Sequence, residues 1–149
     1  MVFVVGLLMT ACNKDRVYME THSVNEEGWP MDEALRYTID VTDTQSVYNL
    51  FLDLRVCRNY RYANAFLFLT TTFPDHGMAA DTLECPLALP DGRWRGKETS
   101  RYVDNRYYFK KHIIFPQPGT YTIDIAHGMR DTVIDGIKDI GLILERATQ

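Results

Sequence analysis

The feature that most constrains the fold is an alternation of apolar and polar side chains with a period of two residues. It is clearest in residues 35–42, 50–57 and 121–126, where every second side chain is apolar. Successive side chains of a β-strand point to opposite faces, so this pattern predicts strands with one buried face. Residues 65–72, an apolar run ending in threonines, predict a strand buried on both faces. No segment shows a convincing helical period, so we expect an all-β fold.

Turn-forming residues separate these strands, at 74–77, 90–92 and 116–119. A weaker strand is expected at 78–89, a strongly β-prone segment follows at 107–115, and a final strand is expected at 141–145. Between them the acidic segment 129–140 carries an Asp at every fourth position, which we interpret as one helical turn with a charged face. About seven or eight short strands with turns between them predict a single antiparallel β-sandwich, Ig-like or jelly-roll-like.

Length and charge limit the classes of function. The chain has 149 residues and a formal net charge of −4, which suit one globular domain with an acidic surface. Phosphate binding needs a basic face, so we expect no nucleic acid as partner. No apolar run reaches the roughly 20 residues that a transmembrane helix needs.

The N-terminus combines an apolar run with a cysteine. Residues 2–9 have the length of a signal-peptide core, and Thr10, Ala11 and Cys12 follow. Met9-Thr10-Ala11-Cys12 resembles the lipobox of bacterial lipoproteins, in which the cysteine becomes the acylated first residue. The domain organisation predicted from this is a lipoprotein signal peptide at 1–11, an acylated N-terminus and tether at 12–34, and a β-sandwich domain at 35–149.

Acylation of Cys12 implies a location at a membrane of the cell envelope. Stable anchoring takes more than one acyl chain, and lipoproteins of this type carry three. Asn13 after the cysteine is compatible with sorting to the outer membrane, which we expect. No Lys or Arg precedes the apolar run, although a secretory signal normally begins with positive charge, so we expect translation to start upstream of Met1.

The sequence shows no motif of an enzyme, and we expect no catalysis, no metal and no cofactor. The familiar nucleophile, metalloprotease and phosphate-binding patterns are absent. Cys57 and Cys85 could form a disulfide in an oxidising compartment. Each lies in an apolar run, however, where a free buried thiol is the commoner outcome, so the pairing stays open. The four histidines lie far apart in the chain, at His22, His76, His112 and His127.

Two loops rich in aromatic residues suggest binding. Residues 59–64 hold two tyrosines with an arginine, and residues 91–97 hold a tryptophan between arginines. Tyr, Trp and Arg are the residues favoured at interface hot spots. Stacking of the tryptophan on an arginine of its own fold is an equally good interpretation. The candidate partner-binding residues are Arg55, Tyr60, Tyr62, Trp94 and Arg95.

Many short motifs occur along the chain in a definite order: the lipobox-like Cys12, Trp29, Tyr48-Asn49-Leu50, Arg55, Tyr60, Asn64, Phe66-Leu67-Phe68, Asp81-Thr82-Leu83-Glu84, the segments 91–96 and 115–121, Met129-Arg130, and the segment 136–141. Their order and spacing resemble the gliding motility lipoprotein GldH family of Bacteroidetes. The resemblance covers nearly the whole chain, although no single motif is diagnostic.

This resemblance implies a non-enzymatic envelope lipoprotein that is an accessory or scaffold component of the gliding machinery and the linked type IX secretion system. Its partners would be the membrane, through acyl chains on Cys12, and other envelope proteins of that machinery. Cys57 and Cys85 do not match the family pattern, which makes a disulfide a weaker expectation. The alternative is a glycan-binding β-sandwich lipoprotein module, because exposed Trp and Tyr side chains can stack on sugars.

Overall fold

The computed structural model describes residues 14–148, and this part of the chain is built from β-strands joined by turns and loops. The strands are β1 (Arg16–Ser23), β2 (Trp29–Pro30), β3 (Leu35–Val41), β4 (Tyr48–Cys57), β5 (Asn64–Thr72), β6 (Met78–Pro86), β7 (Lys97–Glu98), β8 (Tyr102–Ile113), β9 (Gly119–His127), β10 (Val133–Ile134) and β11 (Ile137–Arg146). The predicted all-β class is confirmed. The predicted number of strands was too low, chiefly because β2, β7 and β10 have only two residues each.

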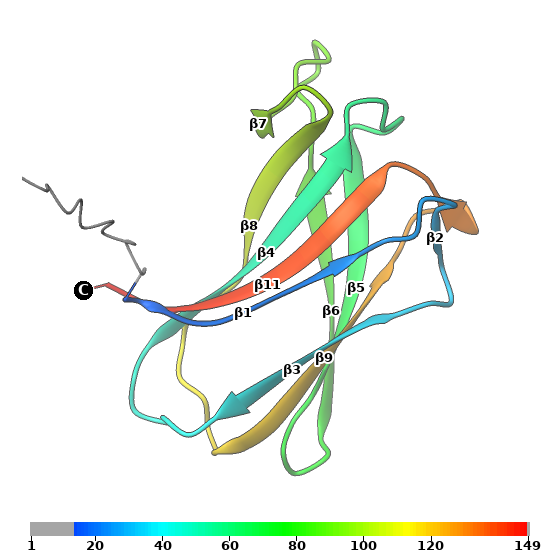
Figure 1. Ribbon diagram of the computed structural model, residues 1–149. Coiled ribbons are helices and arrows are strands. Elements are labelled where there is room, and N and C mark those ends of the chain that lie inside the picture. Colours follow the sequence, from blue (N-terminus) through cyan, green and yellow to red (C-terminus); the bar gives the residue numbers. More distant parts are fainter. Residues whose placement is uncertain (1–13, 149) are drawn as a thin grey trace, which may run out of the picture.

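Two antiparallel sheets pack face to face as a sandwich (Figure 1). The five-stranded sheet has the order β1-β11-β4-β8-β7, and the four-stranded sheet has the order β3-β9-β5-β6. A short ladder of β2 and β10 lies beside them. Neighbouring strands in each sheet are often distant in the sequence, so the fold depends on long-range pairing.

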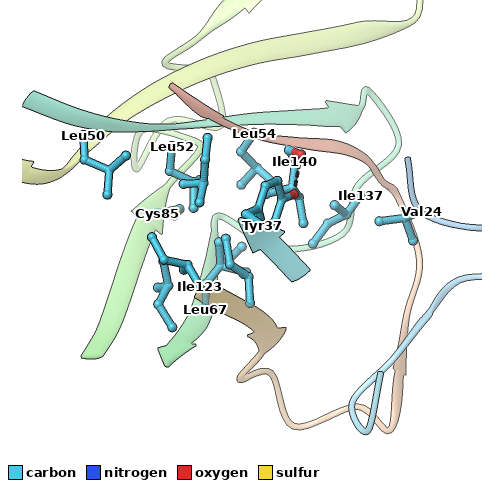
Figure 2. Packing of buried hydrophobic residues seen from close by; sticks show 14 of the residues in the cluster. Val24, Tyr37, Leu50, Leu52, Leu54, Leu67, Cys85, Ile123, Ile137 and Ile140 are labelled. Carbon is cyan, nitrogen blue, oxygen red and sulfur yellow. Dashed lines mark hydrogen bonds between the residues drawn. The ribbon is translucent and has the colours of Figure 1, made fainter. Parts of the chain in front are cut away.

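The alternation in the sequence decides which side chains enter the core. On β4, Leu50, Leu52, Leu54 and Val56 are buried between the sheets, and the residues between them point outward. Figure 2 shows these leucines packed against Leu67 and Ile123 of the four-stranded sheet and around Tyr37. The apolar face of each sheet is thereby covered by the other.

The expected tether at residues 12–34 needs correction, because the fold begins at Arg16 rather than at residue 35. Residues 16–23 form β1, which pairs with β11 at the edge of the five-stranded sheet. Trp29 is fully buried, and its Nε1 donates a hydrogen bond to the carbonyl oxygen of Glu33 at 2.7 Å. The sequence did not predict β1, because an edge strand exposes most of its side chains and lacks a strong apolar alternation. Residues 1–11 and Cys12 lie outside the described part of the chain.

The helical turn expected in residues 129–140 is also wrong. The chain forms β10, reverses at Gly136 with φ of +91°, and enters β11. Ile134, Ile137 and Ile140 are buried at intervals of three residues, a spacing that resembles a helix. Ile134 lies on β10, before the turn, and a register shift between Ile137 and Asp139 accounts for the interval from Ile137 to Ile140 on β11.

The two remaining cysteines are free thiols. Cys57 is half-buried on β4, and Cys85 is fully buried on β6 in the other sheet. Within residues 14–148 no helix is long and apolar enough to cross a bilayer.

Candidate functional site

An apolar row crosses the outer face of the five-stranded sheet, the face that points away from the four-stranded sheet. Met19 of β1, Ile143 of β11, Phe51 of β4 and Tyr108 of β8 are successive Cα partners across these strands. The rings of Phe51 and Tyr108 lie with their centroids 4.6 Å apart. Met19 is 54% exposed and Tyr108 48% exposed, whereas Ile143 beside them is completely covered. The row is therefore an apolar strip that is packed at its centre and open to solvent at both ends.

Two arginine–aspartate pairs lie on the same face. Arg55 Nε donates to Asp104 Oδ1 at 2.6 Å and Nη2 donates to Oδ2 at 3.2 Å. Arg106 makes the matching pair with Asp53, at 2.6 and 2.8 Å. In each pair the arginine and the aspartate are directly opposite on β4 and β8, so the antiparallel register itself creates the two-pronged contact.

Weaker contacts extend these pairs across the sheet and join them to the apolar row. Arg55 Nη1 lies 3.8 Å from Asp139 Oδ2 on β11. The guanidinium carbon of Arg106 lies 5.3 Å from the centroid of the Phe51 ring, which is a cation–π contact. Arg106 is thus the residue that connects the charged pairs to the aromatic row.

A hollow of about 410 Å³ opens among these charged side chains. Its floor is formed at Gly141 of β11, which has no side chain to fill it. A Cβ atom at this position would lie 2.9 Å from Oγ1 of Thr21 on β1. The bare backbone at Gly141 therefore keeps the hollow open between β1 and β4.

We call the apolar row, the two pairs and the hollow the outer face. The residues that line it are Met19, Thr21, Phe51, Asp53, Arg55, Asp104, Arg106, Tyr108, Asp139, Gly141 and Ile143.

Among the candidate residues taken from the sequence, only Arg55 lies on the outer face. Tyr60 is only 6% exposed, and its hydroxyl donates to the carbonyl oxygen of Asn64 at 2.9 Å, so it belongs to the core. Burial also raises its pKa, because the charged phenolate would be poorly solvated. Tyr62 is half-buried, and its hydroxyl donates to Asp131 Oδ2 at 2.5 Å.

The other two candidates lie in the loop between β6 and β7. Trp94 is half-buried, packs against the hydrophobic core and forms an isolated β-bridge with Ala88. Arg95 is exposed. The five candidates therefore divide between the outer face and two loops. The only direct contact among them that the structure records joins Tyr60 and Tyr62, whose ring centroids are 5.9 Å apart.

Sequence reasoning missed most of the outer face. Phe51 carried a usable signal, because it is a large aromatic residue at a solvent-facing position of the alternation in β4. Asp104, Arg106 and Tyr108 carried none, because their importance depends on the pairing of β8 with β4, some fifty residues apart in the chain.

Within residues 14–148 no group of three or more His, Cys, Asp or Glu side chains could hold a metal ion. His127 is buried, and burial lowers its pKa, but it lies in the core beside Trp29 rather than on an open surface. The fold and the outer face thus define a β-sandwich domain with a mixed aromatic and charged surface of the kind that protein interfaces use.

Comparison with known proteins identifies the family. The model of the GldH lipoprotein family matches residues 16–144 of the chain. The chain is 31% identical to the gliding motility lipoprotein GldH homolog of Christiangramia forsetii, over 95% of this chain and 90% of that protein. It is 30% identical to the gliding motility lipoprotein GldH of Flavobacterium johnsoniae, over 95% of this chain and 91% of that protein.

The chain belongs to the GldH lipoprotein family, which confirms the resemblance seen in the sequence. As a member it is a lipid-anchored lipoprotein of the cell envelope. The matched range begins at Arg16, the residue at which β1 begins.

Proposed function

We propose that this chain is a non-enzymatic scaffold component of the gliding motility and type IX secretion machinery. It is held at the outer membrane by acyl chains on Cys12 and binds another envelope protein through its outer face. Support for the gliding role comes from the family and from the names of both relatives, which are gliding motility lipoproteins. Support for binding comes from the chemistry of the outer face.

The observation that carries the proposal is the apolar row of Met19, Ile143, Phe51 and Tyr108. The core of the sandwich is on the opposite face of the sheet, so this row is not needed to join the two sheets. Exposed clusters of large apolar side chains rimmed by polar ones mark interaction sites on soluble domains. The aromatic pair of Phe51 and Tyr108 within this surface suits a hot spot.

The two arginine–aspartate pairs suit the rim of this interface. Exposed ion pairs contribute little to folding, typically about 0–1 kcal/mol. Their fixed geometry instead presents a defined pattern of charge, which steers a partner and excludes the wrong ones. A partner surface with an apolar centre and its own paired charges would complement the outer face.

The experiment replaces Tyr108 by Asp in cells of the source bacterium. Phe68 is the matched control, because it is 49% exposed against 48% for Tyr108 but lies on β5 in the other sheet. We expect Tyr108→Asp to lower surface spreading, secretion of type IX substrates and co-purification of envelope proteins. Phe68→Asp should lower none of them when both variants reach the envelope at wild-type amounts.

Two results would contradict the proposal. Spreading and secretion that are unchanged after deletion of the gene would remove this chain from the machinery. Equal effects of Tyr108→Asp and Phe68→Asp would leave the machinery role in place but remove the outer face as its binding surface.

The glycan-binding alternative depended on an exposed Trp94. That side chain is half-buried and packs against the core, which leaves less of the ring free to stack on a sugar. Binding on a glycan array that is lost with Trp94→Ala would favour this alternative over a protein partner.

A further inference from the structure

The chain between the predicted acylation site and the folded domain is very short. The carbonyl oxygen of Asp15 accepts a hydrogen bond from the backbone N–H of Arg146 at 2.8 Å, so the chain is already attached to the sandwich at Asp15. Three residue steps separate Cys12 from Asp15. Since an extended chain spans at most about 3.6 Å per residue, Asp15 lies within about 11 Å of the acylated cysteine.

One end of the sandwich is therefore confined to the membrane surface. Strand pairing places the start of β1, the end of β11 and the start of β4 together, through the partners Arg16↔Glu145 and Arg146↔Tyr48. The start of β4 in turn pairs with the end of β8 at Ile113. Figure 1 shows the loop between β3 and β4 and the loop between β8 and β9 on this same side of the molecule. We call the loops 42–47 and 114–118, with residues 14–15 and 147–148, the anchored end.

We propose that the anchored end rests on the lipid headgroups, with Ile114 inserted among them and Lys111 beside their phosphates. The anchor then fixes the orientation of the domain as well as its location. This inference rests on acylation of Cys12, which is part of the proposed function.

One side chain of the anchored end and one of the adjoining part of β8 suit a headgroup surface. Ile114 is a large aliphatic residue that directly follows β8, and it is 55% exposed. Lys111 forms no ion pair with any described residue, and its ammonium lies 4.3 Å from the centroid of the Tyr108 ring. An exposed apolar residue and a lysine three residues before it in the chain suit a surface that contacts phospholipid.

One acidic side chain of the anchored end, Asp43, is directed into its own loop. Asp43 accepts hydrogen bonds from the hydroxyl of Ser46 at 2.6 Å, from two backbone N–H groups and from the hydroxyl of Tyr48. Arg146 lies 3.9 Å from the same carboxylate. The hydrogen bonds, that from the Ser46 hydroxyl first, hold the pKa of Asp43 well below its usual range, so the carboxylate stays ionised. Arg146 is the cation that partly offsets this charge.

This orientation has a consequence for the outer face. Phe51 lies three residues along β4 from Tyr48, so the apolar row is roughly 10 Å from the anchored end at about 3.3 Å per residue. A partner bound to the row is then itself at the membrane surface. The kind of partner that fits is an integral or lipid-anchored envelope protein rather than a freely diffusing one.

The test measures how close each end lies to lipid. The full acylated protein, carrying Cys57→Ser to remove the accessible native thiol, is reconstituted in vesicles of phosphatidylethanolamine and phosphatidylglycerol that contain a headgroup nitroxide lipid. One fluorophore is attached at Ile114→Cys. The matched control is the same fluorophore at Ser100→Cys, an exposed position between β7 and β8 at the opposite end of β4, about 30 Å away.

We expect the nitroxide to quench the label at position 114 several-fold more than the label at position 100. Insertion of about ten Gly and Ser residues after Asn13 should make the two values converge, because a long flexible linker no longer holds the anchored end down. Equal quenching without the insertion, or stronger quenching at position 100, would overturn the orientation.

Flotation of the vesicles separates the two proposals. Protein that fails to float with the vesicles would show that Cys12 does not anchor the chain, and it would overturn this inference together with that part of the proposed function. Protein that floats but shows equal quenching would overturn only the orientation.

Discussion

The hydroxyl of Tyr37 on β3 donates a hydrogen bond to the backbone carbonyl oxygen of Ile140 on β11, over a distance of 2.6 Å (Figure 2). Both residues are fully buried, so the bond links the two sheets through the middle of the core. His22 of β1 packs edge-on against the Tyr37 ring with centroids 4.6 Å apart. One tyrosine thus connects the four-stranded sheet to two strands of the other sheet.

Tyr37→Phe should destabilise the protein. The substitution removes the donor and leaves the buried carbonyl of Ile140 without it, which costs about 1–3 kcal/mol in the free energy of unfolding. Tyr108→Phe is the control, because that ring is half-exposed and its change should stay within about 0.5 kcal/mol. Chemical denaturation measures both, and equal losses would contradict an inter-sheet role for the Tyr37 hydroxyl.

The ion pairs of the outer face should contribute little to stability. The side chains of Arg55 and Asp104 are 43% and 37% exposed, so water screens their attraction. A double-mutant cycle of Arg55→Ala and Asp104→Ala should give a coupling energy below about 1 kcal/mol. A coupling above about 2 kcal/mol would show that the pair holds the fold together, and would weaken the case for a surface kept for recognition.

Acidification should destabilise the fold through His127. Burial lowers its pKa from the usual value of about 6.5, while Asp131 and the backbone of Trp29 and Thr132 act in the opposite direction. The unfolded chain therefore binds a proton at His127 more readily than the folded chain does. The contribution of His127 to the free energy of unfolding is fully present above about pH 6.5 and is lost as the pH drops toward the lower folded pKa. The loss attributable to one group is at most about 1.4 kcal/mol per pH unit.

The check compares wild type with His127→Phe. Each protein is unfolded by denaturant at about pH 7.5 and pH 5.5, which bracket the pKa of unfolded histidine. The variant should lose less stability than wild type between these two values. A steeper loss in the variant would mean that protonated His127 is favoured in the fold.

The two described cysteines should differ sharply in reactivity. Burial raises the pKa of the Cys85 thiol to about 12, so almost no reactive thiolate exists near neutral pH. Cys57 is half-buried on β4 and more open to reagent. Iodoacetamide followed by mass mapping should modify Cys57 in the native protein and Cys85 only after denaturation. Equal protection of both thiols that is lost on reduction would reveal a disulfide.

The strands with two well-separated faces could be predicted from the sequence. The alternation at 35–42, 50–57 and 121–126 corresponds to β3, β4 and β9, within a few residues at each boundary. β1 could not be predicted, because its outward side chains face solvent and its pattern resembles an irregular leader. The short strands β2 and β10 hold only two residues each, too few for any periodicity.

The outer face was less predictable than the fold, because it depends on register. Of its residues, only Arg55 is a candidate from the sequence, because of its residue type. The contact of Arg55 with Asp104 and the contact of Phe51 with Tyr108 form because the register of β4 and β8 places these residues opposite one another. Small shifts in that alignment would separate both pairs, and the local sequence does not encode the alignment.

Photo-crosslinking in living cells tests the outer face most directly. A photoreactive amino acid replaces Tyr108 in one strain and Phe68, the equally exposed aromatic residue of the other sheet, in a second strain. We predict a discrete, irradiation-dependent adduct with a membrane-associated envelope protein from position 108 and none from position 68. An adduct from position 68 alone, or none from either position, would contradict a partner-binding role for the outer face.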